Sequence, residues 1–207
     1  MDRIFVLKSS TARTSSDFNL RDLPSSSGRL EVVCRCAISA ILDSGRIRRD
    51  TVFVGVLEGP PSPPLSLRFD GGRLRDLPFS EIALAAMLKD VFRDLEKSDM
   101  HVSPCPPGLL VEKKSFNEAI SSEMTSNKRG ALYYLHEKGE DIRNADMSIQ
   151  DTKIFIVGDQ KGLTAEDEHV LDELRAKRVR VGPISYLSSQ VITLVHYELD
   201  RKETRRG

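Results

Sequence analysis

The sequence predicts an α/β protein with a largely parallel sheet. Short apolar runs, typical of strands, alternate with longer segments in which apolar residues recur every three or four positions, as in helices. Between Lys153 and Leu199 the order strand, glycine-bearing loop, helix occurs twice in succession. No linker rich in proline, glycine or serine divides the 207 residues, so we expect a single domain over residues 1–200.

The N-terminal half opens with a predicted strand from Ile4 to Leu7, followed by the polar segment 11–28, which has no periodicity. A loop of that length is usually functional or disordered. An amphipathic helix then begins near Ser27, and its apolar stripe reaches Ile41. Two further strands are expected at 51–57 and 65–69, separated by the segment EGPPSPP, whose prolines exclude regular structure.

The middle of the chain continues the alternation. We expect a helix over 80–97, a short strand over 109–111 and a strand over 131–136. Ser115 and Glu118 have the spacing of a capping box, which predicts that a helix begins there and runs through Met124. The acidic, glycine-containing segment EKGEDIRNADMS follows this strand.

The C-terminal part holds the two repeated units. A strand over 154–157 leads to a helix that opens near Thr164, where Thr164 and Asp167 repeat the capping pattern. Val179 and Val181 predict a short strand, and a mostly apolar helix follows from about Ser185 to Leu199. The basic tail 201–207 is expected to be disordered.

The composition limits the classes of partner that the protein is expected to bind. Lys plus Arg and Asp plus Glu each number 31, so the formal net charge is zero and nucleic acid could be bound only through local basic patches. No stretch approaches the roughly 20 apolar residues of a membrane span. Three cysteines, an odd number, suit a reducing compartment, and we expect a cytoplasmic protein. Cys34 and Cys36 point to different sides of one helix and the four histidines are scattered, so no metal site is expected.

The sequence motifs predict where a ligand binds, but they do not indicate which reaction is catalysed. The chain has no GxGxxG, GxxxxGK[ST] or GxSxG sequence. Glycine-bearing loops at the carboxyl ends of neighbouring strands predict a small-molecule site at Leu135, residues 158–162 and residues 181–187. Within it, Asp159 has two open alternatives, a hydrogen bond to a ribose hydroxyl or a cap for its own loop.

Several long, irregular blocks carry a family resemblance. They are SSDFNLRDLPSSSGRLEVVCRC, EGPPSPPLSLRF, YYLHEKGEDI, IFIVGDQKGL and RAKRVRVGPISYL. Together, and in the same order, they resemble the TrmY family of archaeal tRNA pseudouridine N1-methyltransferases, which belongs to the SPOUT superfamily. The resemblance covers the chain from about Ile4 to Leu199.

The resemblance implies a SPOUT fold whose residues from about 130 to 200 form a trefoil knot, a homodimer packed through the knot, and S-adenosylmethionine as cofactor. It implies methylation at N1 of pseudouridine in the tRNA T-loop, at position 54. The family often has a cysteine where this chain has Val191. The cofactor contacts that it implies are Leu135, Gly158, Val181, Gly182, Pro183, Ile184, Ser185 and Tyr186.

The residues of the chemical step and of RNA binding are less defined. Asp17, in a loop that matches the family, is the candidate general base, with a loop-structuring role as the alternative. The candidates for phosphate contacts are Arg29, Arg35, Arg48 and Arg49. Two other functions stay open: a Nep1-like enzyme that methylates a pseudouridine of ribosomal RNA, and a non-catalytic module that binds RNA or a nucleotide.

Overall fold

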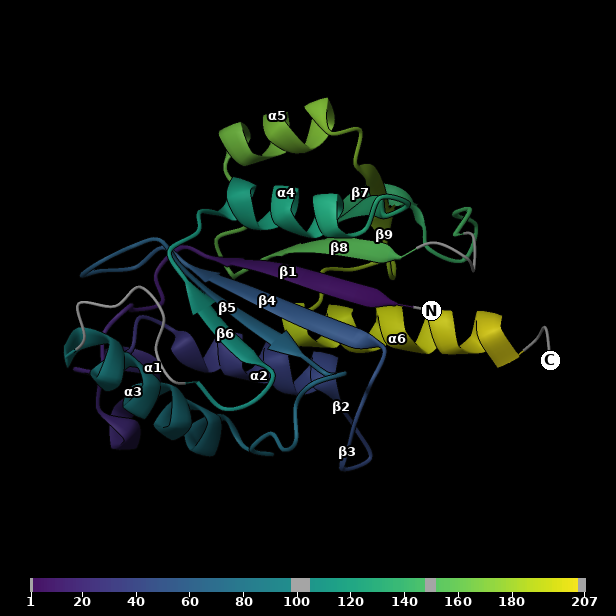
Figure 1. Ribbon diagram of the computed structural model, residues 1–207. Coiled ribbons are helices and arrows are strands. Elements are labelled where there is room, and N and C mark those ends of the chain that lie inside the picture. Colours follow the sequence, from purple (N-terminus) through teal and green to yellow (C-terminus); the bar gives the residue numbers. More distant parts are fainter. Residues whose placement is uncertain (1, 98–104, 148–151, 205–207) are drawn as a thin grey trace.

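One mixed sheet forms the centre of the molecule in the computed structural model, which describes residues 2–97, 105–147 and 152–204 (Figure 1). Its seven strands lie in the order β6-β5-β4-β1-β8-β7-β9. The five strands from β4 to β9 pair in parallel, and β5 and β6 add an antiparallel edge, so the predicted mostly parallel sheet is confirmed. The strands are β1 (Arg3–Ser9), β4 (Thr51–Leu57), β5 (Leu65–Asp70), β6 (Leu109–Glu112), β7 (Ala131–Asp141), β8 (Lys153–Gly158) and β9 (Lys177–Arg180).

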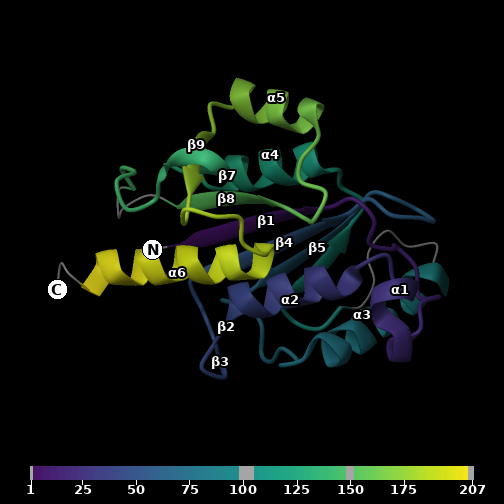
Figure 2. The same cartoon turned by 180° about the vertical axis from the view of Figure 1, so that it is seen from behind.

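Helices cover both faces of the sheet and make a three-layer α/β/α arrangement (Figures 1 and 2). On one face lie α4 (Phe116–Ser126) and α5 (Ala165–Glu173). The other face carries α1 (Leu23–Ser26), α2 (Leu30–Ile41), α3 (Glu81–Lys97) and α6 (Ser188–Thr204). A single turn of 3-10 helix, η1 (Leu20–Asp22), and a hairpin of β2 (Leu42–Asp43) and β3 (Arg46–Ile47) complete the chain order.

The central strand β1 is buried along its whole length and supplies both cores. Phe5 stacks on Phe155 of β8 with ring centroids 5.3 Å apart, and Phe155 stacks in the same way on Tyr133 of β7. This row of rings belongs to the core under α2, α3 and α6, whereas Ile4 and Val6 belong to the core under α4 and α5. Alternation of side chains along a strand, with both faces covered, therefore explains why the middle of β1, residues 4–7, is apolar without interruption.

The first residue of β1 fixes helix α6. The Arg3 guanidinium is 1% exposed, and its Nη1 lies 2.7 Å from the Asp200 carboxylate and 3.0 Å from His196 Nδ1. His196 Nε2 lies 3.0 Å from the Ala40 carbonyl of α2. Since arginine only donates, Nδ1 accepts and Nε2 carries the ring proton. A neutral imidazole thus joins β1, α2 and α6.

Both predicted capping boxes are confirmed. Ser115 and Glu118 exchange hydrogen bonds at the start of α4, and Thr164 and Asp167 do the same at the start of α5. Each box satisfies amide groups that would otherwise lack partners in the first helical turn.

Three boundaries of strands and helices that were predicted from the sequence were wrong. The strand predicted over 131–136 is longer, because β7 continues to Asp141 and Glu140 pairs with Val179 of β9. Helix α6 begins at Ser188, not near Ser185. It also runs to Thr204, so residues 201–204 are not a disordered tail, whereas 205–207 lie outside the described residues. The Lys202 ammonium fixes the last turn by donating to two carbonyls of the 142–145 segment, at 3.0 and 3.2 Å. Composition could not reveal these distant partners.

No helix in the described part of the chain is both long enough and apolar enough to cross a membrane.

Because the His196 imidazole is buried and neutral, we expect the free energy of unfolding to depend on pH. Burial, with the charges of Arg48 and Arg3, lowers the pKa of His196 to about 3. The unfolded chain binds a proton there near pH 6.5 and the folded chain does not, so stability falls as the pH drops from 7 toward 3. We expect this residue alone to lower the free energy of unfolding by about 2 kcal/mol between pH 7 and pH 5. Urea unfolding at the two pH values measures it.

The matched control is His169, an exposed histidine of α5. His196→Gln should flatten the dependence between pH 7 and pH 5, whereas His169→Gln should leave it as in the unaltered protein. An equal slope in all three proteins would contradict the role of His196.

Candidate functional site

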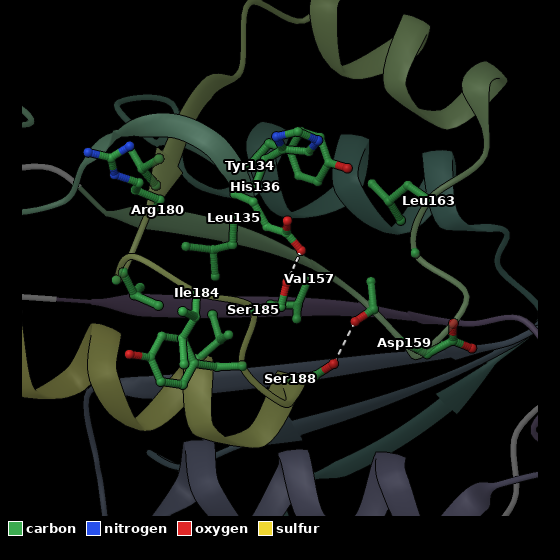
Figure 3. Close-up of a pocket in the computed structure, with 18 of the residues that line it drawn as sticks. Tyr134, Leu135, His136, Val157, Asp159, Leu163, Arg180, Ile184, Ser185 and Ser188 are labelled. Atoms are coloured by element: carbon green, nitrogen blue, oxygen red, sulfur yellow. Dashed lines mark hydrogen bonds between the residues drawn. The ribbon is translucent and has the colours of Figure 1, made fainter.

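A cavity of about 320 Å³ opens at the carboxyl ends of β7, β8 and β9, beside the first turn of α6 (Figure 3). This edge of a parallel sheet is where α/β proteins commonly bind small ligands. Seven of the eight predicted cofactor contacts line it, and Pro183 does not. Val191, where the family often has a cysteine, lines it too, as does His136. The lining residues that sequence reasoning did not single out are Tyr134, Glu137, Val157, Leu163, Glu168, Val179, Arg180 and Ser188.

A bulge in β7 forms one wall. Leu135 and Glu140 both pair with Val179 of β9, so the residues between them project from the ladder and bring His136 and Glu137 to the cavity. Gly139 closes the bulge, since a Cβ there would lie 2.5 Å from the Val179 backbone nitrogen. Position 139 therefore has room only for glycine, and the bulge depends on that glycine. The glycine in EKGEDI was the signal for it, but it also suited a loop.

The end of β8 forms the floor. Asp159 is 7% exposed, and its carboxylate accepts from the Ser10 amide at 2.7 Å and the Lys161 amide at 2.8 Å. These bonds favour the loop-capping alternative for Asp159. Gly158 turns the chain so closely that an added Cβ would lie 2.9 Å from the Gly162 Cα. The floor is therefore a tight turn held by backbone donors.

The segment between β9 and α6 forms the opposite wall. The Ser188 hydroxyl donates to the Gly158 carbonyl at 2.7 Å, which ties the start of α6 to the floor. The Ser185 hydroxyl donates to the Glu137 carboxylate and so joins this segment to the bulge (Figure 3). Apolar side chains make up the walls between these polar ties: Leu135, Val157, Val179, Val181, Ile184 and Val191. Such walls suit a flat heteroaromatic ring, with backbone groups at its edges.

A polar group stands at the rim. The Tyr134 hydroxyl donates to Glu168 at 2.8 Å, and burial together with this bond raises the pKa of Tyr134, so the phenol stays protonated. His136 Nδ1 accepts from the Lys138 amide at 3.1 Å, which leaves the ring proton on Nε2 in the neutral form. Over residues 2–97, 105–147 and 152–204, no three potential ligands cluster in a way that could hold a metal ion.

The candidate base lies outside the cavity lining in this single chain. Arg13 Nε donates to the Asp17 carboxylate at 2.9 Å, and Ser15 also donates to it. These hydrogen bonds lower the pKa of Asp17, which makes it a weaker proton acceptor. The geometry favours the loop-structuring alternative, and the catalytic role of Asp17 stays a prediction.

The four arginines predicted to contact phosphate all have partners within the chain. Arg29 pairs with Glu31 and Arg35 with Glu81, both at 2.7 Å, and these two guanidinium groups are half-exposed on the α2 side. The other two have structural contacts. Arg48 pairs with Asp200 at 3.0 Å, and Arg49 donates to the carbonyls of residues 71 and 74.

A family model described as "Putative SAM-dependent RNA methyltransferase" matches residues 2–204. The chain belongs to this family. One relative, from Methanocaldococcus jannaschii, is named tRNA (pseudouridine(54)-N(1))-methyltransferase and is 37% identical over 204 residues, 97% of each chain. A relative of the same name from Methanosarcina acetivorans is 40% identical over 206 residues, which cover 99% of this chain and 94% of its own.

Among solved structures, Nep1 of Archaeoglobus fulgidus bound to S-adenosylhomocysteine superposes with a TM-score of 0.64. The match covers 99% of this chain and all of that one at 14% identity. It shows a shared fold.

The cavity fits the cofactor of this family. Apolar walls can hold an adenine ring. A Cβ at Gly158 would lie 2.9 Å from the Gly162 Cα and one at Gly182 would lie 2.6 Å from the Tyr186 ring, so both turns of the lining need glycine. The residues that would hold the cofactor come from β7, β8 and the segment before α6, which are mutually tied by the hydrogen bonds of Ser185 and Ser188.

The tight turn at the floor makes a test of the site. In Gly158→Ala the new Cβ would meet the Gly162 backbone at 2.9 Å, so the floor must move. We expect S-adenosylmethionine to bind about tenfold more weakly, measured by calorimetry. The control is Gly72→Ala, where the Cβ would face the Asp70 side-chain carboxylate at 3.2 Å, in a turn away from the cavity. Unchanged affinity in Gly158→Ala, with the fold retained, would contradict this use of the turn.

Proposed function

We propose that this protein transfers a methyl group from S-adenosylmethionine to N1 of the pseudouridine at position 54 of tRNA. The observation that carries the proposal is the 37–40% identity, over nearly the full chain, to relatives named for that reaction. The cavity supports it, because seven of the family's eight cofactor positions converge on one site there.

The residues of this chain do three things in the reaction. The cofactor, when bound, supplies the methyl group on a sulfonium sulfur. The apolar walls keep water from the reacting atoms, and the tied loops fix the orientation in which N1 must approach, which supplies much of the acceleration. N1 also loses a proton. Asp17 stays our candidate acceptor, and in a dimer it would have to reach the cavity of the partner.

The second part of the proposal is that the substrate is tRNA and not ribosomal RNA. The relatives' names favour tRNA, whereas the likeness to Nep1 is one of fold at 14% identity and gives the ribosomal alternative less support. A T-loop base lies inside the folded elbow of tRNA, so it must be turned out of its stack to reach the cavity. The cofactor cavity, lined by seven of the eight positions that the family implies, favours an enzyme over a non-catalytic module.

We also propose a homodimer, a trefoil knot within about 130–200 and a cytoplasmic location, where tRNA is modified. Large apolar side chains on the segment before α6 and on α6 itself support the dimer. Ile184, Leu187 and Tyr197 are 66, 59 and 56% exposed in the single chain. A second copy would remove this apolar surface from water.

Methyl transfer from labelled S-adenosylmethionine tests the function directly. The substrates are a tRNA transcript carrying pseudouridine 54, the same transcript with uridine, and a ribosomal RNA helix with its own pseudouridine. We expect incorporation only in the first, with the added mass mapped to nucleotide 54. Transfer confined to the ribosomal helix would establish the alternative, and tight cofactor binding without any transfer would establish the non-catalytic module.

Arg29 and Arg35 are the better placed of the phosphate candidates, because each is half-exposed and paired with one carboxylate. We take Arg35 for the test. In Arg35→Ala we expect weaker tRNA binding and a plot of log affinity against log salt that is shallower by about one unit. Arg93→Ala is the control, since that arginine is also exposed and paired with a single helical carboxylate. An unchanged slope for Arg35→Ala would remove it from the RNA interface.

A further inference from the structure

The charges around the cavity are unequal. Three carboxylates line it, from Glu137, Asp159 and Glu168, against one guanidinium, from Arg180. Two of the carboxylates are already compensated. Asp159 is capped by two backbone amides, and Glu168 accepts from the Tyr134 hydroxyl and lies 3.6 Å from the Arg178 guanidinium.

Glu137 is different. Its hydrogen-bond partner is the neutral Ser185 hydroxyl, and no ion pair to it forms within the described part of the chain. Figure 3 shows Arg180 at the outer edge of the site, apart from Ser185. The cavity therefore has one carboxylate that is oriented by a hydroxyl and lacks a counter-charge among the residues that the structure describes.

The two forms of the cofactor differ by one charge at the reacting atom. S-adenosylmethionine has a sulfonium, an ammonium and a carboxylate. After methyl transfer, S-adenosylhomocysteine has a neutral thioether with the same ammonium and carboxylate. A negative group beside the cavity is attracted to the sulfonium form and gains nothing from the thioether.

We propose that Glu137, oriented by Ser185, is the counter-charge that makes this cavity bind the methyl donor more tightly than its demethylated product. This inference rests on the proposed use of S-adenosylmethionine and goes beyond it by assigning ligand discrimination to a residue of the β7 bulge. Glu137 is a specificity-determining residue here, and Ser185 a positioning residue. Loss of the sulfonium charge at methyl transfer weakens the attraction and favours release of the product.

The exposure of Glu137 to solvent sets how much it can contribute to cofactor affinity. Glu137 is on the exposed side of the bulge, so solvent screens it and the attraction has the strength of a surface ion pair. A surface pair corresponds to an affinity change of up to about fivefold. Discrimination should decline as salt rises, because the pair is open to solvent.

Calorimetry with three ligands tests the proposal without measuring activity. The ligands are S-adenosylmethionine, S-adenosylhomocysteine and sinefungin, in which an amine-bearing carbon replaces the sulfonium. In Glu137→Gln we expect about fivefold weaker binding of the two cationic ligands and less than a twofold change for S-adenosylhomocysteine. Ser185→Ala should give a smaller loss with the same selectivity. The matched control is Glu140→Gln, an exposed glutamate of the same strand that does not line the cavity.

The outcomes are distinct. An equal loss for all three ligands would place Glu137 against the shared ammonium and overturn the proposal, as would no loss for any. Unaltered protein that binds none of the ligands would overturn the proposed function as well. A second measurement needs no variant: the preference of the unaltered protein for S-adenosylmethionine over S-adenosylhomocysteine should shrink as salt rises from about 0.05 to about 0.5 M. A preference that does not change with salt would count against an ionic origin.

Discussion

The structure depends on the buried charges at the two ends of β1. Arg3 at one end meets Asp200 of α6, and Lys8 at the other meets Asp167 of α5 at 2.7 Å. Both cations are almost completely buried, and each has a second carboxylate nearby, Glu203 at 3.1 Å from Arg3 and Glu58 at 3.2 Å from Lys8, which offsets the cost of burying the charge. Removing one partner of a buried pair such as Lys8 and Asp167 typically costs about 3–5 kcal/mol, whereas the pair of Arg3 with the half-exposed Asp200 contributes less. The first strand of the chain is thereby joined to its last two helices.

The cavity follows from this constraint. Lys8 fixes the start of α5, and the Lys8 carbonyl accepts from the Asp159 amide, so the same residue positions the floor. Arg3 and His196 fix α6 against β1 and α2, which sets where the first turn of α6 and Ser188 lie. Cofactor affinity and global stability are therefore coupled through β1, although no β1 side chain lines the cavity.

Local signals in the sequence predicted most of the fold. The alternation of strands and helices, the apolar β1 and the two capping boxes depend on neighbouring residues, and all are confirmed. The errors occur where a distant partner decides. The extension of β7 needs Val179 of β9, and the last turn of α6 needs carbonyls near residue 145. The periodicity of a segment cannot predict contacts with residues that are distant in the sequence.

The site shows the same division. Glycine loops at strand ends indicated its location, and the family resemblance indicated residues from three segments that the fold brings together. Glu137 and Glu168 looked like members of an acidic loop and a helix surface, because charge in a sequence does not reveal which carboxylates find a cation. That information is in the geometry, where Glu168 faces Arg178 and Glu137 faces a serine.

The arginines extend this argument to RNA. The chain is formally neutral, and each of its four predicted phosphate contacts already has an acceptor within the chain. A guanidinium that must share or leave an internal carboxylate gains less from a phosphate than a free one does, since one ion pair replaces another. Affinity built only on these residues would be low. Under the proposed function, specificity then rests on the shape of the folded tRNA and on accommodation of one base beside the cofactor cavity, whose loops are tied by the hydrogen bonds of Ser185 and Ser188.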